Sequence, residues 1–219
     1  MLRNSSRVVA VLGSAGVTGW ITIGTDRTHN QRAVQLAQRF DRMFAAVGFH
    51  PHHANEVTDD DIAFLEQAVQ AEKVVAIGET GLDYHYDFSP REVQRAVFIR
   101  QLDLARQVGK PIIIHTREAH ADTMAIVRRE GKGLAGVFHC FSGSLEMAQE
   151  LIKMGFYIGF TGTMVFPNSK KLKRIATEIP MDRVLIETDC PYLTPPPFRG
   201  KRNEPAYVQY VAAEIAALR

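Results

Sequence analysis

The sequence predicts an α/β fold in which repeated strand–helix units build a parallel sheet. Seven short runs rich in apolar and β-branched residues alternate with longer amphipathic segments over nearly all of the 219 residues. The runs are apolar almost throughout, which is typical of parallel strands covered on both faces. Hydrophobic residues make up 46% of the chain and charged residues 23%, which excludes a disordered protein, since disorder goes with low hydrophobicity.

The predicted strands are, in order, Gly19–Thr25, Met43–His50, Val74–Glu79, Pro111–Thr116, Leu134–Phe141, Phe156–Thr161 and Val184–Asp189. Helices are predicted between them, most clearly over Glu92–Val108, where apolar residues recur at spacings of three and four. Helix starts are predicted where Ser, Thr or Asn precedes acidic residues, at Thr58, Ser89, Ser144 and Asn203. Gly109 predicts a helix end. At the front of the chain, Ser5–Ala15 is predicted as the last turns of a helix that ends at Gly16.

An open doubly wound sheet and a closed barrel both fit this alternation. No G-x-G-x-x-G follows the first predicted strand, so the fingerprint of a dinucleotide-binding fold is absent. A (β/α)₈ barrel has eight strands and takes about 250 residues, so this chain is short of both. We therefore expect that the strand preceding the helix over Ser5–Ala15 is missing.

The net charge and the number of cysteines limit which binding partners and which cellular compartment we expect. Lysine and arginine number 26 against 24 acidic residues, a formal charge of +2, so any nucleic-acid contact must be local. No apolar run approaches the roughly 18 residues needed to cross a bilayer. The two cysteines, Cys140 and Cys190, are too few for a disulfide framework, and we interpret both as small buried residues. We expect a cytoplasmic monomer without membrane association.

Five of the predicted strands end in a histidine or a carboxylate: His50, Glu79, His115, His139 and Asp189. In a parallel barrel such ends converge on one face, where active sites are built. One histidine after a strand is more often a hydrogen-bonded loop residue, but five equivalent positions favour a metal site for Zn²⁺, Mn²⁺ or Mg²⁺. Without a cation, the cluster would bury costly charge. The remaining histidines near these motifs are interpreted as ordinary loop residues: His52, His53, His85 and His120.

Six ordered motifs carry a resemblance to a known family: Gly48–His52, Gly78–Tyr84, Ile114–Arg117, His139–Gly143, Glu187–Leu193 and Arg199–Pro205. They closely resemble the signatures of TatD-type metal-dependent deoxyribonucleases, and the similarity runs from about Gly16 to the C-terminus. The resemblance implies an incomplete TIM (β/α)₈-type barrel with seven recognisable strands. It also implies a hydrolase that cuts phosphodiester bonds of DNA with divalent metal ions (Mg²⁺, Mn²⁺ or Zn²⁺), for example as a 3'-5' exonuclease.

The resemblance further implies a role for each residue of the expected metal site. Glu79 would bridge two metals, while His115 and His139 would complete one of the two sites. Asp189 would serve the other site and would orient or deprotonate the attacking water. Glu79 and Asp189 are therefore the expected catalytic residues.

Substrate contacts are expected from residues around the same site. Arg117 is placed to bind a phosphate oxygen bidentately, although a solvated arginine at a helix start explains it equally well. His50 is expected to bind substrate as well. The basic stretch Arg199–Arg202 could track a nucleic-acid backbone, and a solvated loop explains it equally well.

The sequence departs from the family pattern at both ends. Family members begin with a strand carrying a His-x-His pair, and no histidine precedes His29 here. The chain ends at Arg219, inside an expected helix. We therefore expect a single domain over residues 1–219, truncated at the N-terminus and at the C-terminus. Three functions stay open: a metal-dependent nuclease of reduced competence, a non-catalytic member that binds metal and nucleic acid, and a barrel acting on an ester or amide.

Overall fold

The computed structural model describes residues 11–13 and 15–219, and it divides into two compact units. The larger unit consists of Gly19–Phe138 and Met154–Phe156. The smaller unit consists of His139–Lys153 and Tyr157–Arg219, together with the described residues that precede Gly19, which are 11–13 and 15–18. No helix in the described part of the chain is both long and apolar enough to cross a membrane.

Every strand predicted from the sequence is present: β1 (Trp20–Ile23), β2 (Met43–Val47), β3 (Val74–Asp83), β4 (Ile112–Arg117), β5 (Gly136–Phe138), β6 (Phe156–Phe160) and β7 (Val184–Ile186). The helices are α2 (Arg27–Arg39), α3 (Asp59–Ala68), α4 (Arg91–Val108), α5 (His120–Glu130), α6 (Leu145–Lys153), α7 (Lys170–Glu178) and α8 (Val208–Leu218). Four 3₁₀ helices complete the described elements: η1 (Pro51–Glu56), η2 (Gly162–Val165), η3 (Met181–Arg183) and η4 (Pro205–Tyr207). The alternation confirms the predicted α/β fold class.

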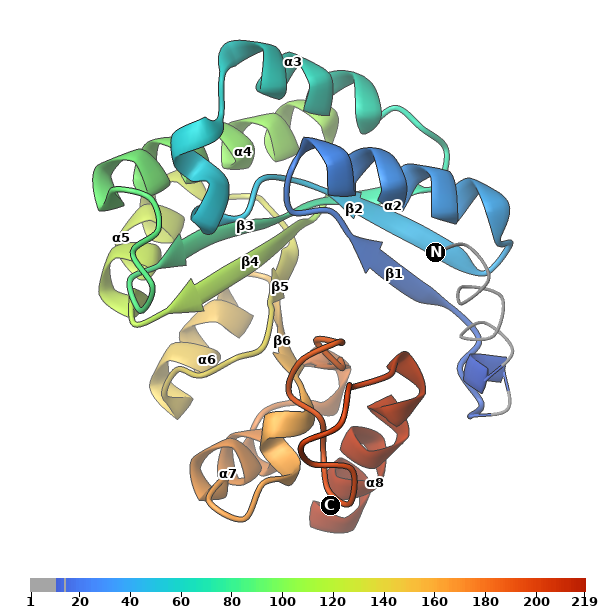
Figure 1. The fold of residues 1–219 in the computed structure, drawn as a ribbon. Helices are drawn as coiled ribbons and strands as arrows, with labels where there is room; N and C mark the ends of the chain where they lie inside the picture. Colours follow the sequence, from blue (N-terminus) through green and yellow to red (C-terminus); the bar gives the residue numbers. More distant parts are fainter. Residues whose placement is uncertain (1–10, 14) are drawn as a thin grey trace. The chain divides into compact units, whose positions relative to one another are not determined.

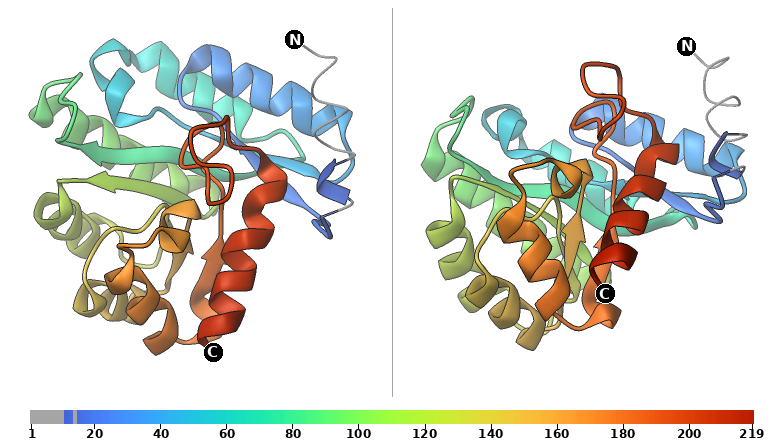
Figure 2. Two further views of the ribbon diagram at one scale, coloured as in Figure 1. Left: turned by 60° about the horizontal axis from the view of Figure 1, so that its bottom comes forward. Right: turned by 90° about the horizontal axis from the view of Figure 1, so that it is seen from below.

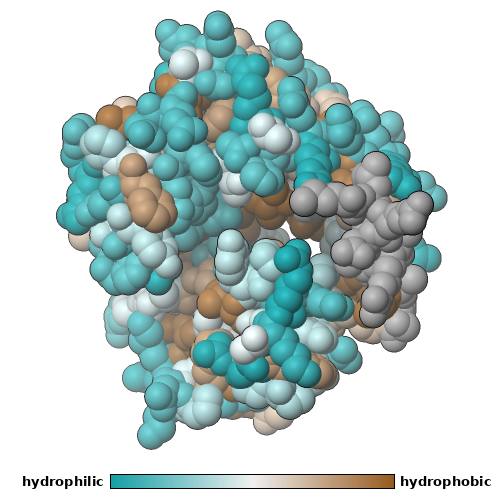
Figure 3. Space-filling model, viewed as in Figure 1, coloured by the Kyte–Doolittle hydropathy of each residue, from teal (hydrophilic) through white to brown (hydrophobic). Residues whose placement is uncertain are grey.

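In the larger unit, β1 to β5 lie side by side in chain order and all pair in parallel. Helices α2, α3 and α4 run along one side of this sheet (Figure 1, Figure 2). The core between them is apolar and fully buried, with Val47, Ile77 and Ile114 from the strands and Phe98 and Leu102 from α4. The outer surface over α2 and α3 is mostly hydrophilic (Figure 3). Because β2, β3 and β4 pair in parallel, their carboxyl ends lie at the same edge of the sheet.

In the smaller unit, β6 and β7 pair in parallel, with Phe160 opposite Ile186. Helices α7 and α8 lie alongside each other (Figure 2), and α8 buries Val211 and Ile215. Most of the helix expected over Ser5–Ala15 lies outside the described residues. Within the part that is described, positions 11–13 are helical.

Helix starts agree with the sequence at α3 and α6, but not at α4 or after Asn203, where η4 begins at Pro205 with Glu204 as its N-cap. Thr58 begins α3 with a capping box that pairs it reciprocally with Asp61, and Gly109 ends α4 in the left-handed conformation at φ 65°. Ser144 accepts a hydrogen bond from the Met147 amide at 3.2 Å, as expected of a residue that starts a helix. Ser89 does not cap α4, which begins at Arg91 without a side-chain cap. The Ser89 hydroxyl instead donates a hydrogen bond to the carbonyl of His52 in η1, at 3.1 Å.

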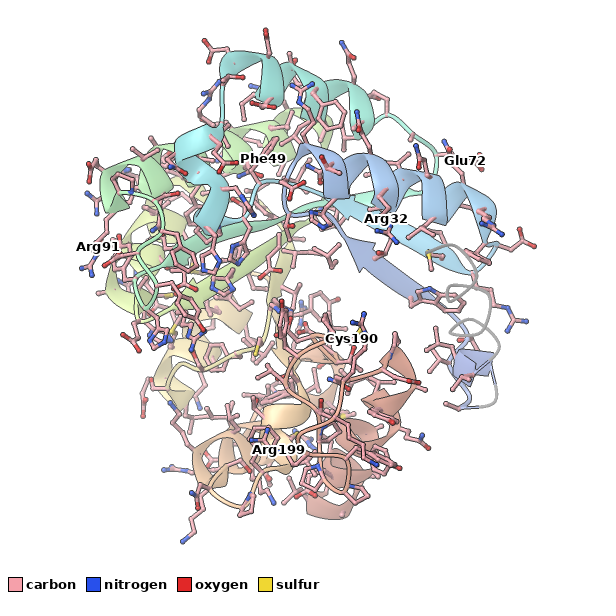
Figure 4. The ribbon with its side chains drawn as sticks, in the orientation of Figure 1. Arg32, Phe49, Glu72, Arg91, Cys190 and Arg199 are labelled. Carbon is pink, nitrogen blue, oxygen red and sulfur yellow. The ribbon has the colours of Figure 1, made fainter. Side chains whose placement is uncertain are left out.

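Two further expectations differ from the structure. The strand predicted over Val74–Glu79 continues to Asp83, because Thr80 to Asp83 keep pairing with Ile114 to Arg117. The interpretation of Cys190 as a buried residue is wrong: Cys190 lies in the loop after β7 and is exposed (Figure 4), while Cys140 is half-buried.

Candidate functional site

Two buried side-chain amides fix the main chain where β2 ends. Asn30 of α2 donates to the Gly48 carbonyl and accepts from the Gly48 amide, both at 2.9 Å. Gln101 of α4 accepts from the Phe49 amide at 2.8 Å and donates to the Phe49 carbonyl at 3.0 Å (Figure 4). Buried main-chain groups outside a sheet need such partners, so the two helices hold the segment that leads into His50.

The close packing of β2 on β3 at this level also requires glycine. A Cβ atom on Gly48 would lie 2.7 Å from the main chain of Gly78, far inside van der Waals contact. The two strand ends can therefore approach each other only with glycine at Gly48. This approach sets His50, which follows β2, beside Glu79 of β3.

Three of the five predicted strand-end residues meet in the larger unit. Ligand atoms of His50, Glu79 and His115 all lie within 4.8 Å of one another. The Nδ1 atom of His115 is 2.9 Å from Oε1 of Glu79, and Nε2 of His50 is 3.7 Å from the same oxygen. Glu79 is only 9% exposed, so its carboxylate is held largely away from water. Imidazole and carboxylate in this arrangement form a donor set that suits a divalent cation.

Asp83, at the end of β3, is a fourth member of this group. Its Oδ2 atom lies 3.1 Å from Nε2 of His115 and 3.0 Å from Nε2 of His52. Its Oδ1 atom accepts hydrogen bonds from the amides of His85 and Tyr86 at 3.0 and 3.1 Å. Burial alone would raise the pKa of Asp83, but these hydrogen bonds hold it far below its usual value. Asp83 is therefore a fixed anion.

The environment of His115 points to a cation at its Nδ1 atom. Asp83 is ionised and can only accept, so Nε2 of His115 carries the proton that it donates to Asp83. In a neutral ring the Nδ1 lone pair then faces the Glu79 carboxylate at 2.9 Å, and two acceptors at that distance repel each other. A second proton or a metal ion between them removes the repulsion. A carboxylate behind the ring is also the usual support of a metal-binding histidine.

His50 has a different arrangement that favours a hydrogen-bond donor. Its Nδ1 atom accepts from the His52 amide at 3.2 Å, where it caps η1. Burial lowers the pKa of His50 to about 3, so the ring is neutral near pH 7. With Nδ1 used as an acceptor, the single ring proton sits on Nε2 and faces Glu79. An N–H at this position fits a contact with a substrate oxygen better than coordination of a metal.

The other two predicted residues, His139 and Asp189, lie close together in the smaller unit. Nδ1 of His139 is 2.5 Å from Oε2 of Glu187, and the same oxygen accepts from the Cys140 amide at 3.1 Å. Nε2 of His139 is 3.4 Å from Oδ1 of Asp189. This group thus repeats the pattern of His115, in which one ring nitrogen faces a supporting carboxylate and the other faces the predicted ligand.

Two further features concern the group around His139: the backbone conformation of Cys140 and Asp189, and the protonation of the Cys140 thiol. Cys140 and Asp189 have φ angles of 43° and 54°, a left-handed conformation that is strained for residues other than glycine. Such strain is concentrated at functional sites. Burial raises the pKa of the Cys140 thiol to about 11, so the free thiol is protonated near pH 7.

The two predicted basic contacts both cover aromatic rings. The guanidinium carbon of Arg117 lies 4.8 Å from the ring centroid of Tyr86. The guanidinium carbon of Arg199 lies 4.1 Å from the ring centroid of Phe166 in the smaller unit (Figure 4). These are cation–π distances, and neither contact tests the predicted binding of phosphate.

Sequence reasoning missed Asp83, Glu187 and the contact of His52 with Asp83. Asp83 and Glu187 stand inside two of the motifs, at the end of one and at the start of the other. A carboxylate near a predicted metal-binding histidine is the signal that could have found them, because such histidines are supported through their second nitrogen.

The sequence and the fold are both similar to those of known proteins. Residues 2–219 match the family model described as TatD related DNase. The metal-dependent hydrolase YabD of Bacillus subtilis, itself uncharacterised, is 50% identical over 91% of this chain and 78% of its own. The 3'-5' ssDNA/RNA exonuclease TatD of Edwardsiella piscicida is 39% identical over 97% of this chain and 85% of its own. The crystal structure of YjjV, a TatD homologue from Escherichia coli, superposes with a TM-score of 0.92 at 31% identity, covering 99% of this chain and 84% of that one.

Proposed function

Since the chain belongs to the TatD related DNase family and has the α/β fold of the TatD homologue YjjV, we propose that it is a divalent-metal-dependent hydrolase of nucleic-acid phosphodiester bonds. The observation that carries this proposal is the position of His115 between two carboxylates, with Nδ1 2.9 Å from Glu79. A metal ion at Nδ1 would satisfy both groups, with Asp83 as the supporting carboxylate that a metal-binding histidine usually has. A phosphodiester substrate is supported by relatives described as exonucleases for single-stranded DNA and RNA.

The proposed metal ligands are Glu79 and His115 in the larger unit and His139 and Asp189 in the smaller one. Asp83 and Glu187 are proposed as positioning residues, because each accepts from the ring nitrogen that is turned away from the ligand position. A bound divalent cation supplies a water of lowered pKa and neutralises charge on the phosphate. Mg²⁺, Mn²⁺ and Zn²⁺ all suit these nitrogen and oxygen donors.

The side chains around the ligands have separate proposed roles. Asp189 orients the attacking water and takes up its proton. His50 donates its Nε2 proton to a phosphate oxygen, since its Nδ1 atom is already occupied by the His52 amide. Arg117 pairs with another phosphate oxygen of the bound nucleic acid. Glu79 and Asp189 are thus the proposed catalytic residues.

The test is cleavage of single-stranded DNA labelled at its 5' or 3' end, with Mg²⁺, Mn²⁺ or Zn²⁺ added to chelator-treated protein. We expect stepwise shortening from the 3' end, its loss in EDTA, and its recovery when metal is restored. His139→Ala should abolish cleavage and remove bound metal by elemental analysis. His29→Gln, which changes an exposed histidine outside the group, should leave both unchanged.

Three results would contradict the proposal. A His139→Ala enzyme with full activity would show that the ligand assignment is wrong. A metal-loaded protein that binds single-stranded DNA without cutting it would favour a non-catalytic member, and turnover of an ester or amide but not of DNA would favour another substrate.

A further inference from the structure

Two large aromatic side chains, Tyr86 and Phe88, are exposed just beyond the carboxyl end of β3. Tyr86 is 48% exposed and Phe88 is 62% exposed. Their rings are stacked, with centroids 5.2 Å apart and planes 11° from parallel. Leaving apolar ring surface in water is unfavourable unless a partner covers it. We name this pair the aromatic platform.

The aromatic platform is fixed to the metal-ligand group of the larger unit. The ring of His52 meets Tyr86 and Phe88 edge-on, at centroid distances of 5.4 and 4.9 Å. Nε2 of His52 is 3.0 Å from Asp83, and the Tyr86 amide donates to the same carboxylate at 3.1 Å. Asp83 in turn contacts His115. A molecule resting on the platform therefore lies beside the proposed reaction site.

A cation borders the aromatic platform. The guanidinium carbon of Arg117 lies 4.8 Å from the Tyr86 ring centroid. A flat aromatic surface next to a positive charge matches one nucleotide, whose base stacks on the rings and whose phosphate meets the arginine. In a duplex, each base is already stacked and paired, so it reaches such a surface only after extrusion. The platform therefore favours an unpaired strand.

We propose that the aromatic platform binds an unpaired nucleobase of single-stranded nucleic acid while Arg117 contacts the adjoining phosphate. This inference rests on the proposed function and adds to it the side chains that recognise the strand through its bases. Tyr86 and Phe88 act by positioning the strand at the site. Stacking accepts every base, so no sequence preference is expected.

The experiment measures binding in EDTA, where no turnover occurs. Fluorescence anisotropy compares a labelled thymidine 12-mer with a strand of equal length built from abasic units. The wild-type protein should bind the strand with bases about 5- to 100-fold more tightly, the effect of one stacked base. The double variant Tyr86→Leu/Phe88→Leu should bind both strands equally and weakly.

Three variants serve as controls. Tyr86→Phe keeps the ring and should keep the preference for bases. Phe44→Leu removes a ring that is 38% exposed at the start of β2, the opposite end of these parallel strands, and should also keep it. Arg117→Met should weaken binding of both strands by the same factor, because both carry phosphates.

Equal affinity of the wild-type protein for the two strands would overturn the proposal. So would a double variant that keeps the preference for bases, or one that changes the oligomeric state, since the platform would then join two copies of the chain. Base-dependent binding without nuclease activity would support the platform and contradict the proposed function. Nuclease activity without base-dependent binding would support the proposed function and contradict the aromatic platform.

Discussion

Gln94 holds the main chain of Asp83 from both sides. Its Oε1 atom accepts from the Asp83 amide at 2.8 Å, and its Nε2 atom donates to the Asp83 carbonyl at 3.0 Å. Gln94 is buried in α4, and Asp83 is the last residue of β3. Because the Asp83 side chain contacts His115, the Gln94 amide helps to position the imidazole through the main chain of Asp83. The stability of α4 and the geometry of the candidate site are therefore linked.

Gln94→Leu should lower the free energy of unfolding by about 1–3 kcal/mol for each buried main-chain group that loses its partner. The Asp83 amide and carbonyl both lose one, and so does the Ser89 carbonyl, which Gln94 binds at 2.8 Å. Urea unfolding followed by circular dichroism measures the change. Gln67→Leu alters an exposed glutamine of α3 and should change stability little. An equal effect of both substitutions would contradict the proposed link.

Asp83→Asn keeps the size of the side chain but removes the negative charge behind His115. We expect metal affinity to fall about 10- to 100-fold, because the supporting carboxylate orients the ring and raises its basicity. Isothermal titration with Zn²⁺ or Mn²⁺ measures the affinity. Asp103→Asn changes an exposed carboxylate paired with Arg106 and should leave it unchanged. Unaltered metal affinity in the Asp83→Asn variant would contradict the role of Asp83 as the carboxylate that supports His115.

Glu187→Gln tests the same principle in the smaller unit. Glu187 accepts from His139 at 2.5 Å and from the Cys140 amide at 3.1 Å. We expect a fall of about 10- to 100-fold in metal affinity. Glu178→Gln, at a carboxylate that pairs with Arg174, is the matched control. Since glutamine still accepts from the Cys140 amide through its carbonyl oxygen, an unfolded variant is not expected, and full affinity would contradict the assigned role.

The strands could be predicted because each is an apolar run bounded by polar residues, a pattern typical of parallel strands. The expected burial on both faces does not hold for β1 and β7, whose residues are half-buried or exposed. The end of β3 could not. The polar Glu79 and Thr80 and the glycine at Gly81 interrupt the run, while the strand continues because it pairs with β4. Pairing between strands is a tertiary effect that local composition does not reveal.

The candidate site was predictable in part for the same reason. The rule that parallel strands end at one edge brings His50, Glu79 and His115 together, as the structure has them. The supporting carboxylates could not be predicted in this way. Asp83 and His115 are 32 positions apart, and which ring nitrogen faces which carboxylate depends on distances set by Gln94 and the turn at η1. Those contacts exist only in the folded chain.

The start of α3 gives the protein a pH-dependent element away from the site. Thr58 and Asp61 form a reciprocal capping box, and Arg27 of α2 contacts Asp61 at 2.7 Å. Burial alone would raise the pKa of Asp61, but hydrogen bonds from Thr58 and Arg27 lower it below its usual value. The folded state therefore binds the proton of Asp61 less readily than the unfolded state does. This difference stabilises the fold above the unfolded pKa of about 3.9 and is lost as the pH falls through the lower, folded value.

Asp61→Asn should accordingly destabilise the protein by about 1 kcal/mol at neutral pH, the usual loss for a helix cap. The difference from the wild type should shrink as the pH falls below about 4, since protonated Asp61 no longer attracts Arg27. Urea unfolding at a series of pH values between 7 and 3 measures both curves. Asp60→Asn removes the same charge from a neighbouring exposed residue and should give a small difference. A difference between Asp61→Asn and the wild type that grows towards low pH would have the wrong sign, and Asp61 would then not be held as an anion by its cap.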